Sequence, residues 1–333
     1  MSAPPLRPGA FTLVELLVSM AILTLLVLIL LSITDATRKT WTYTNSKIEQ
    51  FRDAREAFET ITRRLSQATL NTYWDYDNPA DPKNYVRQSE LRFLSGPDLV
   101  PESPTHAVFF QAPLGESEAY SEMKNLLNTC GYFIEFGSDK ESRPSFVNSP
   151  ERYRFRLMEM IEPSESLTLY KHTNGKPDYT GTDWFTVPLA NPAYKRPVAE
   201  NILGLILLPK LATGDKNSAG TPFQASDLAP HYTYDSTEKN ADSALNPKNQ
   251  LPPVVRVTMI AVDEASYNRL QASDTSAPDI VGRYFHDATK FDDDIKSLET
   301  ELVRKKLNYR IFTTEVPIKA AKWSRSQSDK QAN

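Results

Sequence analysis

The stretch FTLVELLVSMAILTLLVLILL, residues Phe11–Leu31, decides how this chain is organised. The run without a charged side chain extends from Leu16 to Thr34, which is 19 residues. As an α-helix it would span about 28 Å, close to the ~30 Å hydrocarbon core of a bilayer. No second run of this kind occurs in the 333-residue sequence, so the pattern predicts one membrane crossing.

The acidic residue Glu15 stands at the edge of this apolar run and separates three interpretations of it. A removable secretory signal peptide would have a shorter run and small residues at a cleavage site, and Thr34 and Ala36 fit that site poorly. A plain signal anchor fits the length, but a carboxylate at this edge costs free energy unless it is paired or reaches the interface. The third interpretation gives Glu15 a function.

The motif GAFTLVELLVSMAIL at residues 9–23 closely resembles the N-terminus of type IV prepilins and pseudopilins. In that family a membrane aspartyl peptidase removes a short leader on the cytoplasmic side, the new N-terminal amine is methylated, and the fifth mature residue is Glu. The resemblance implies that a prepilin peptidase and methyltransferase cleaves between Ala10 and Phe11, which makes Glu15 the fifth residue. Ala10 stands where the family usually has Gly, and Gly9 is displaced by one position, so we expect slower processing at most.

Glu15 would then act in assembly. A carboxylate in low-dielectric surroundings favours an opposite charge, and the Phe11 amine exposed by cleavage is one. Pairing between Glu15 of one subunit and the Phe11 amine of a neighbour would fix the axial register of a filament. The expected partners are therefore other pilin-like subunits, contacted through the N-terminal helix.

The charges beside the apolar run weakly favour the opposite orientation, because Arg7 precedes the run and Arg38 and Lys39 follow it. The processing motif nevertheless requires a cytoplasmic N-terminus, since the leader is cut on that side. We therefore expect a single-pass protein of the inner membrane with a periplasmic globular domain. After assembly it would lie in a filament or at the cell surface.

Apolar residues continue at three- and four-residue spacing beyond the membrane segment, with charged residues between them. This pattern is typical of an amphipathic helix with one buried stripe. No proline occurs between Phe11 and Asn78, so we expect one helix of about 60 residues. The stripe consists of Ile48, Phe51, Ala54, Phe58, Ile61, Leu65 and Ala68.

After residue 78 the pattern changes to the period of two that is typical of strands. A long helix followed by many strands implies an α+β fold, in which a mainly antiparallel sheet packs against the second half of the helix, as in pilin-like subunits. The strands at 201–211 and 252–264 are apolar enough to be central. Further strands are expected around residues 89–95, 106–112, 131–137, 152–160, 183–190 and 307–323, and a helix at 292–307.

The sequence also predicts the organisation of the chain into segments. The polar stretch 211–253 is expected to be a long, mobile loop within the globular domain. The predicted segments are a leader at 1–10, a transmembrane and assembly helix at 11–34, its amphipathic continuation at 35–75, a periplasmic domain at 76–323 and a disordered tail at 324–333.

Several polar residues receive structural rather than chemical interpretations. Alternation places Arg152, Arg154 and Arg156 on one strand face, which we interpret as solvent-exposed rather than as a binding surface. Cys130 is the single cysteine, which excludes an internal disulfide, and its apolar neighbours indicate a small buried residue. The adjacent acids Asp263 and Glu264 are expected at a strand-end turn, because neighbouring residues of a strand face opposite sides.

No group of residues or motif in the sequence indicates an enzyme, a cofactor or a nucleic-acid partner. The net charge of −4 comes without a basic stripe, and nucleotide-binding and hydrolase motifs are absent. The acids Asp292–Asp294 indicate the first turn of a helix rather than a calcium loop, and hence no metal site is predicted. The histidines lack metal-ligand spacing; they are His106, His172, His231 and His286.

The leading hypothesis is a structural minor pilin or pseudopilin of a type IV pilus-like or type II secretion-like filament, such as a J-type subunit. The alternative is a membrane-anchored surface-binding or adhesin module that contacts a ligand through 211–253 or the three arginines. A membrane-anchored enzyme is the third class. The stretches at 57–78, 251–266 and 307–324 resemble the Verru_Chthon cassette protein C family, prepilin-type proteins of Verrucomicrobia and relatives.

Overall fold

The computed structural model describes residues 13–323 apart from 102, 121–122, 141–145, 147–150, 174–175, 178–180, 218 and 271–275. The chain divides into two compact units, Met1–Gln50 and Phe51–Asn333. The second unit, residues 51–333, is called the head below. The leader at 1–10 and the tail at 324–333 lie outside the described residues.

Helix α1 (Leu13–Leu65) has 53 residues and belongs in part to each unit. Within the head it carries the predicted apolar stripe, whose burial is confirmed from Ala54 onward, whereas Phe51 is only partly buried. The buried stripe residues are Ala54, Phe58, Ile61, Leu65 and, just beyond the helix, Ala68.

The helix ends at Leu65 and does not reach the predicted boundary at 75. Ala68 N donates to Leu65 O at 3.0 Å, which closes the last turn. Thr69 N then donates to Gln111 O at 2.9 Å, in strand β4 (Ala107–Pro113). The backbone amide groups after Leu65 therefore find their hydrogen-bond acceptors in a tight turn and in strand β4 rather than in a further helical turn. The periodicity of apolar residues does not distinguish these two possibilities.

The larger sheet of the head has six strands in the order β11-β3-β4-β5-β6-β9. Every neighbouring pair is antiparallel, and the consecutive strands β3 to β6 form a meander. Besides β4, the strands are β3 (Phe93–Gly96), β5 (Leu127–Ser138), β6 (Tyr153–Glu162), β9 (Lys195–Glu200) and β11 (Tyr234–Asp235).

The smaller sheet has three antiparallel strands in the order β10-β12-β13. These are β10 (Ile202–Lys210), β12 (Val254–Val262) and β13 (Tyr309–Pro317). The prediction that β12 is central is confirmed. The same prediction is wrong for β10, which ends the strand order, although all its residues are buried.

The outer edge of β10 bonds to the segment that leads into β4. Leu205 N donates to Thr105 Oγ1 at 3.1 Å, and His106 N donates to Leu205 O at 3.1 Å. The two sheets are therefore joined by direct hydrogen bonds as well as by side-chain packing. This junction explains why an end strand is wholly buried.

Helices and short ribbons complete the head. The helices are α2 (Asp183–Ala190), α3 (Glu264–Leu270) and α4 (Phe291–Arg304), with 3₁₀ turns η1 (Ser164–Ser166), η2 (Thr168–Tyr170), η3 (Pro192–Tyr194), η4 (Ser243–Leu245) and η5 (Ala288–Lys290). Two-stranded ribbons pair β1 (Tyr73–Tyr76) with β2 (Tyr85–Gln88) and β7 (His172–Thr173) with β8 (Lys176–Pro177).

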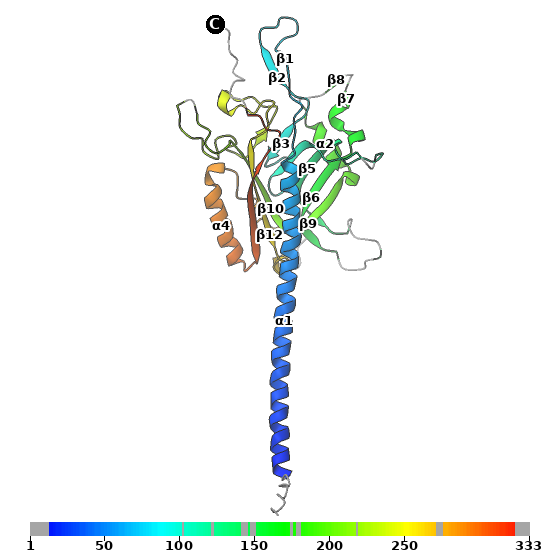
Figure 1. Ribbon diagram of the computed structural model, residues 1–333, viewed down its shortest axis with the longest axis vertical. Helices are drawn as coiled ribbons and strands as arrows, with labels where there is room; N and C mark the ends of the chain where they lie inside the picture. The colour runs from blue at the N-terminus through cyan, green and yellow to red at the C-terminus, as the bar shows by residue number, and fades with distance from the viewer. Residues whose placement is uncertain are drawn as a thin grey trace, which may run out of the picture. The chain divides into compact units, whose positions relative to one another are not determined.

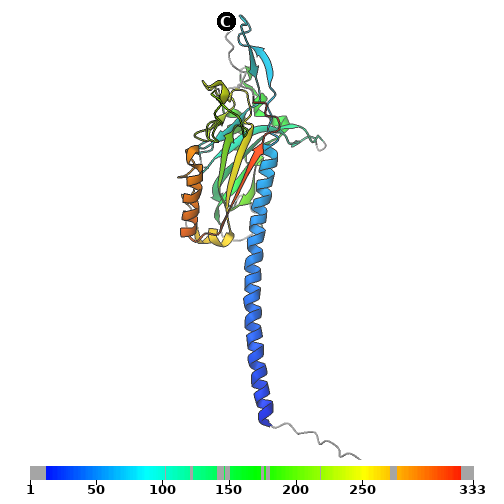
Figure 2. The same ribbon diagram turned by 60° about the vertical axis from the view of Figure 1, so that its left-hand side comes forward.

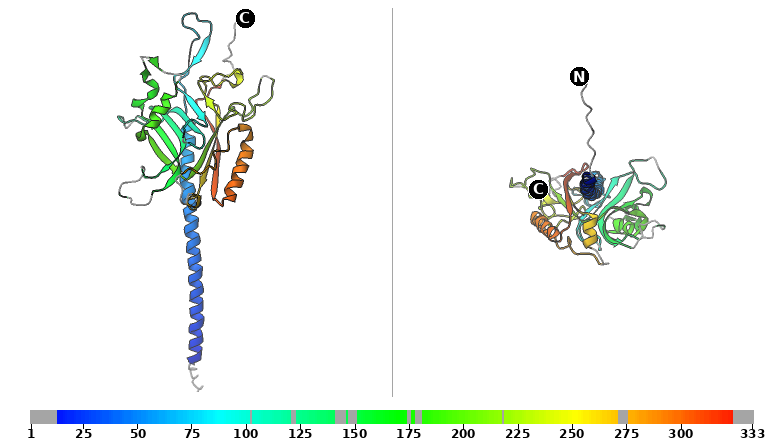
Figure 3. Two further views of the ribbon diagram at one scale, coloured as in Figure 1. Left: turned by 180° about the vertical axis from the view of Figure 1, so that it is seen from behind. Right: turned by 90° about the horizontal axis from the view of Figure 1, so that it is seen from below.

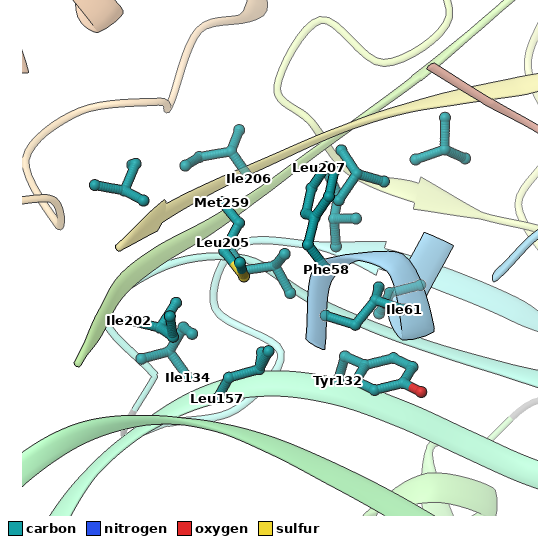
Figure 4. Close-up of a cluster of buried hydrophobic side chains, with 14 of the residues drawn as sticks. Phe58, Ile61, Tyr132, Ile134, Leu157, Ile202, Leu205, Ile206, Leu207 and Met259 are labelled. Carbon is teal, nitrogen blue, oxygen red and sulfur yellow. The ribbon is translucent and has the colours of Figure 1, made fainter. Parts of the chain in front are cut away.

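The head is layered, with α2 outside the six-stranded sheet and α4 outside the three-stranded sheet (Figure 1; Figure 2; Figure 3). The main core lies between the two sheets and includes the head portion of α1. Figure 4 shows Phe58 and Ile61 of α1 between Tyr132 and Leu157 on one side and Leu207 on the other. A smaller core packs Phe109, Trp184 and their neighbours beneath α2. The predicted α+β fold with a mainly antiparallel sheet is thus confirmed.

Two local predictions of secondary structure differ from the structure. The segment 183–190, expected as a strand, is the helix α2, whose Trp184 and Phe185 are buried. A run of eight residues is too short for its periodicity to separate a strand from a helix. The stretch 211–253, expected as a loop, contributes β11 to the larger sheet and buries Tyr232 and Tyr234.

The interpretation of the arginine face as solvent-exposed is wrong for Arg154 and Arg156, which are each 5% exposed. Arg154 pairs with Glu264 at the start of α3 and with Glu200 of β9, the latter at 2.9 Å. Arg156 pairs with Glu135 of β5 at 3.3 Å. Carboxylates from three other elements therefore cover the two guanidinium groups, and burial of a charge requires such partners.

Candidate assembly segment at the N-terminus

The first unit contains an apolar helical segment, Leu13–Trp41, none of which is buried among the described residues. Leu13–Trp41 is the one helix among the described residues that is long and apolar enough to cross a membrane. Its apolar side chains are exposed, with Leu13 at 75% and Leu31 at 61%. A contiguous apolar surface of this size requires an apolar cover, for which lipid or other apolar helices would serve.

Five hydroxyl groups within Leu13–Trp41 bond to the backbone of their own helix. Each donates to the carbonyl oxygen four residues earlier, at 2.7–2.9 Å. Such internal bonds remove the cost of placing a hydroxyl in hydrocarbon or in a dry helix bundle. The residues are Ser19, Thr24, Thr34, Thr37 and Thr40.

Of the predicted site residues, the structure describes only Glu15. It lies in the first turn of α1, where the partial positive charge of the helix N-terminus favours a carboxylate. Ser19, which lies one turn after Glu15, donates through its Oγ to the Glu15 backbone oxygen. Gly9, Ala10 and Phe11, where cleavage and methylation are predicted, lie outside the described residues.

A buried ionic cluster anchors the last turn of α1 in the head. Arg64 pairs with Glu159 of β6, which is 2% exposed and also accepts a hydrogen bond from the Tyr132 hydroxyl. Arg196 of β9 donates to the other oxygen of Glu159 at 2.7 Å. Two cations and one phenol therefore satisfy a carboxylate that burial alone would make costly.

The pKa values of this cluster follow from its burial and its charges. Burial lowers the pKa of Arg64, but Tyr132 and Glu159 outweigh burial and raise it above the ordinary value. Burial, with Cys130 and Glu159, raises the pKa of Tyr132. Arg64 is thus charged and Tyr132 neutral, as a structural anchor requires. Glu159 was not predicted as a site residue, although an acid on the apolar face of an alternating strand is a signal that the sequence carries.

The remaining polar candidates serve the fold. Cys130 is confirmed as a buried strand residue, and burial raises the pKa of its thiol, which keeps it protonated. Asp263 Oδ1 accepts from Ser266 N at 2.7 Å, at the strand-end turn that was predicted. Asp292–Asp294 form the first turn of α4, as predicted, and Asp294 accepts from Phe285 N at 2.9 Å. Within the described residues, no three His, Cys, Asp or Glu side chains gather as metal ligands.

Comparison with known proteins bears on the N-terminus alone. The family described as "Prokaryotic N-terminal methylation motif" matches residues 7–31. No curated protein and no solved structure matches the chain. The matched range contains the predicted cleavage position and Glu15, and it runs into the apolar helix described above. The motif therefore supports a type IV pilin-like protein, which implies processing by a prepilin peptidase and assembly with other pilin subunits.

Proposed function

We propose that this chain is a structural minor pilin or pseudopilin subunit of a type IV pilus-like or type II secretion-like filament, processed before Phe11. The methylation motif at 7–31 carries the proposal, because it overlaps the segment Leu13–Trp41, whose apolar side chains are exposed. In the membrane that surface faces lipid, and in the filament it faces neighbouring helices. The resemblance to the Verru_Chthon cassette protein C family makes Verrucomicrobia and their relatives the proposed source.

The proposed chemistry at the N-terminus is a charge pair between subunits. Cleavage exposes the Phe11 amine, and methylation keeps its positive charge. Glu15 of a neighbouring subunit supplies the opposite charge in surroundings of low dielectric, where the pair sets axial register. No step of this function requires a catalytic group in the head, and we propose a structural protein rather than an enzyme.

The proposed topology has the N-terminus in the cytoplasm of the cell and the head in the periplasm. The apolar segment Leu13–Trp41 is compatible with membrane anchoring. The hydroxyls bonded to their own helix, Ser19 and Thr24 among them, suit such a location. An inner-membrane subunit of this topology delivers its head to the filament surface as the helix leaves the bilayer.

The deciding experiment is intact-mass and N-terminal peptide mass spectrometry on protein from the native membrane. A chain that begins at N-methylated Phe11 is the expected result. A chain that still begins at Met1 would make this a plain anchored protein. A start beyond Asp35 would mean an exported protein without the assembly helix, and the filament proposal would fall.

A further inference from the structure

The ribbon formed by β1 and β2 lies at the end of the head where α1 ends (Figure 1; Figure 2). It carries exposed aromatic side chains. The antiparallel register places Trp74 opposite Arg87 and Tyr76 opposite Tyr85. Because side chains alternate along a strand, these four lie on one face, which we call the aromatic face. The exposed fractions are 57% for Trp74, 45% for Tyr76 and 67% for Tyr85.

The rings of the aromatic face are held in position. The Arg87 guanidinium lies 5.5 Å from the centroid of the Trp74 ring. The Tyr76 and Tyr85 rings have centroids 5.1 Å apart, and their hydroxyls lie within 3.5 Å of each other. A platform whose rotamers are already fixed loses little conformational entropy when a ligand binds.

Arg87 connects the aromatic face to a cleft of about 160 Å³. Three segments meet there: the one after α1, the one before β12 and the one after β13. Arg87 donates to Gln250 Oε1 at 3.0 Å, and Asn249 Nδ2 donates to Arg87 O. At about 30 Å³ per water the cleft has room for roughly five waters, which suits one small polar ring rather than a drug-sized ligand. Its lining residues are Leu70, Thr72, Arg87, Asn249, Gln250, Leu251, Ala320 and Lys322.

The charges around this surface indicate a neutral ligand. Asp75, Asp77 and Asp81 lie on the ribbon and its turn and would repel a polyanion. Asp77 is ionised, because backbone hydrogen bonds from Lys83 and neighbouring residues lower its pKa to about 2. The cations Arg87 and Lys322 line the cleft and would repel a polycation.

The composition of the ribbon also argues against insertion into the hydrocarbon core of a bilayer. Among residues 73–88, all of which the structure describes, the large exposed apolar side chains are aromatic and none is aliphatic. Trp and Tyr present a flat apolar ring with a polar tip. Such rings match the apolar faces of sugar rings, whose hydroxyls need hydrogen-bonding groups of the kind that line the cleft.

We propose that the aromatic face and the adjoining cleft bind a neutral polysaccharide. Sugar rings stack on Trp74 and Tyr85, and the hydroxyls of one ring bond to polar groups of the cleft. This site is independent of the N-terminal helix. It therefore stands whether or not the chain enters a filament.

The test uses the full chain in detergent micelles, mixed with insoluble cellulose, chitin and mannan, and measures protein lost from the supernatant. At least one of the three should deplete the wild type. Trp74→Ala and Tyr85→Ala should each weaken that binding tenfold or more without lowering the thermal midpoint, because both side chains are exposed. Tyr170→Ala, which removes an exposed tyrosine of η2, is the matched control and should bind as the wild type does.

Three outcomes would overturn the proposal. The first is failure of all three polysaccharides to deplete the wild type. The second is equal binding by wild type and Trp74→Ala. The third is binding of the wild type to an anionic polymer alone, or self-association of the wild type in sedimentation that Trp74→Ala abolishes and sugar does not affect. Either result would assign the aromatic face to another partner.

Discussion

At the scale of single residues, His106 makes the stability of the head depend on pH. It is fully buried, its Nδ1 accepts from Leu207 N at 3.1 Å, and its Nε2 donates to Phe285 O at 3.0 Å. Burial is the main cause that lowers its pKa to about 4, against about 6.5 in an unfolded chain. Between these values the unfolded state binds more protons, so stability rises with pH. The contribution of His106 to the free energy of unfolding is complete above pH 6.5 and is lost as the pH falls towards 4. The total change is on the order of 3 kcal/mol.

This pH dependence can be isolated with His106→Gln, which does not titrate. The measurement is the urea midpoint of the full chain in detergent at intervals between pH 4 and 7. The variant should be less stable at pH 7 and should show a shallower fall towards pH 4. His231→Gln, at an exposed position, should follow the wild type. Parallel curves for wild type and His106→Gln would assign the acid sensitivity to other groups.

Gly131 is a position where the addition of one carbon is expected to be costly. A Cβ there would lie 2.3 Å from Cδ1 of Phe109. That ring cannot withdraw, because it stacks on Phe185 with centroids 4.4 Å apart beneath α2. Gly131→Ala should lower the free energy of unfolding by about 3 kcal/mol, as overpacking of a core does.

The control for Gly131→Ala is Gly137→Ala in the same strand. There the nearest atom is Nη2 of Arg156 at 3.1 Å, the end of a flexible side chain. Urea unfolding of both variants should show the larger loss at Gly131. Equal losses would show that the β5 backbone, rather than the Phe109 ring, sets the cost.

Individual residues also show what a sequence reveals about a site. Glu15 and Cys130 were interpretable because one stands out within an apolar run and the other is surrounded by strand-forming residues. The partners of Glu159 could not be predicted, since Arg64 and Arg196 come from other elements. A buried ion pair joins residues far apart in the chain, and nothing in their local spacing announces it.

At the scale of elements, the head portion of α1 is held by its apolar stripe. Ile61 is fully buried between the two sheets (Figure 4). Ile61→Ala should cost 2–5 kcal/mol, the range for large-to-small changes in a core. Arg55→Ala on the exposed side of the same helix removes only a pair with Glu59 and should change stability by about 0.5 kcal/mol or less. Similar losses for the two variants, measured by urea unfolding, would contradict the packing of α1 between the sheets.

Helices and strands with a clear periodic spacing of apolar residues were predictable from the sequence. Those whose conformation depends on tertiary contacts were not. The stripe of α1, the alternation of β6 and the acidic first turn of α4 each follow from local pattern. The helix α2 and the strand β11 do not, because a short apolar run and a polar stretch adopt whichever form their neighbours support. The β10 edge, covered by Thr105 and His106, depends on contacts across about one hundred residues.

At the scale of the whole molecule, assembly is the property to test. Glu15→Ala should leave cleavage before Phe11 largely intact and block incorporation into filaments. Glu15→Gln keeps the size of the side chain and removes its charge, so it should fail as the alanine variant does if charge is the cause. Glu15→Asp keeps the charge and should retain more assembly than either. The measurement is mass spectrometry of the membrane and filament fractions, and normal incorporation of Glu15→Gln would refute the charge pair.

The hydrogen bond between Leu205 and Thr105 has a further consequence for the rate at which the head forms. It joins positions 100 residues apart, and β11 pairs with β3 across an even longer separation. Contacts so distant must close large loops before they contribute energy, so folding is expected on the slow scale of all-β domains rather than that of helical bundles. During this interval the unpaired edges of β3 to β6 are available to neighbouring chains. A newly synthesised head therefore needs a chaperone, or separation from other copies of the chain, until β10 has paired.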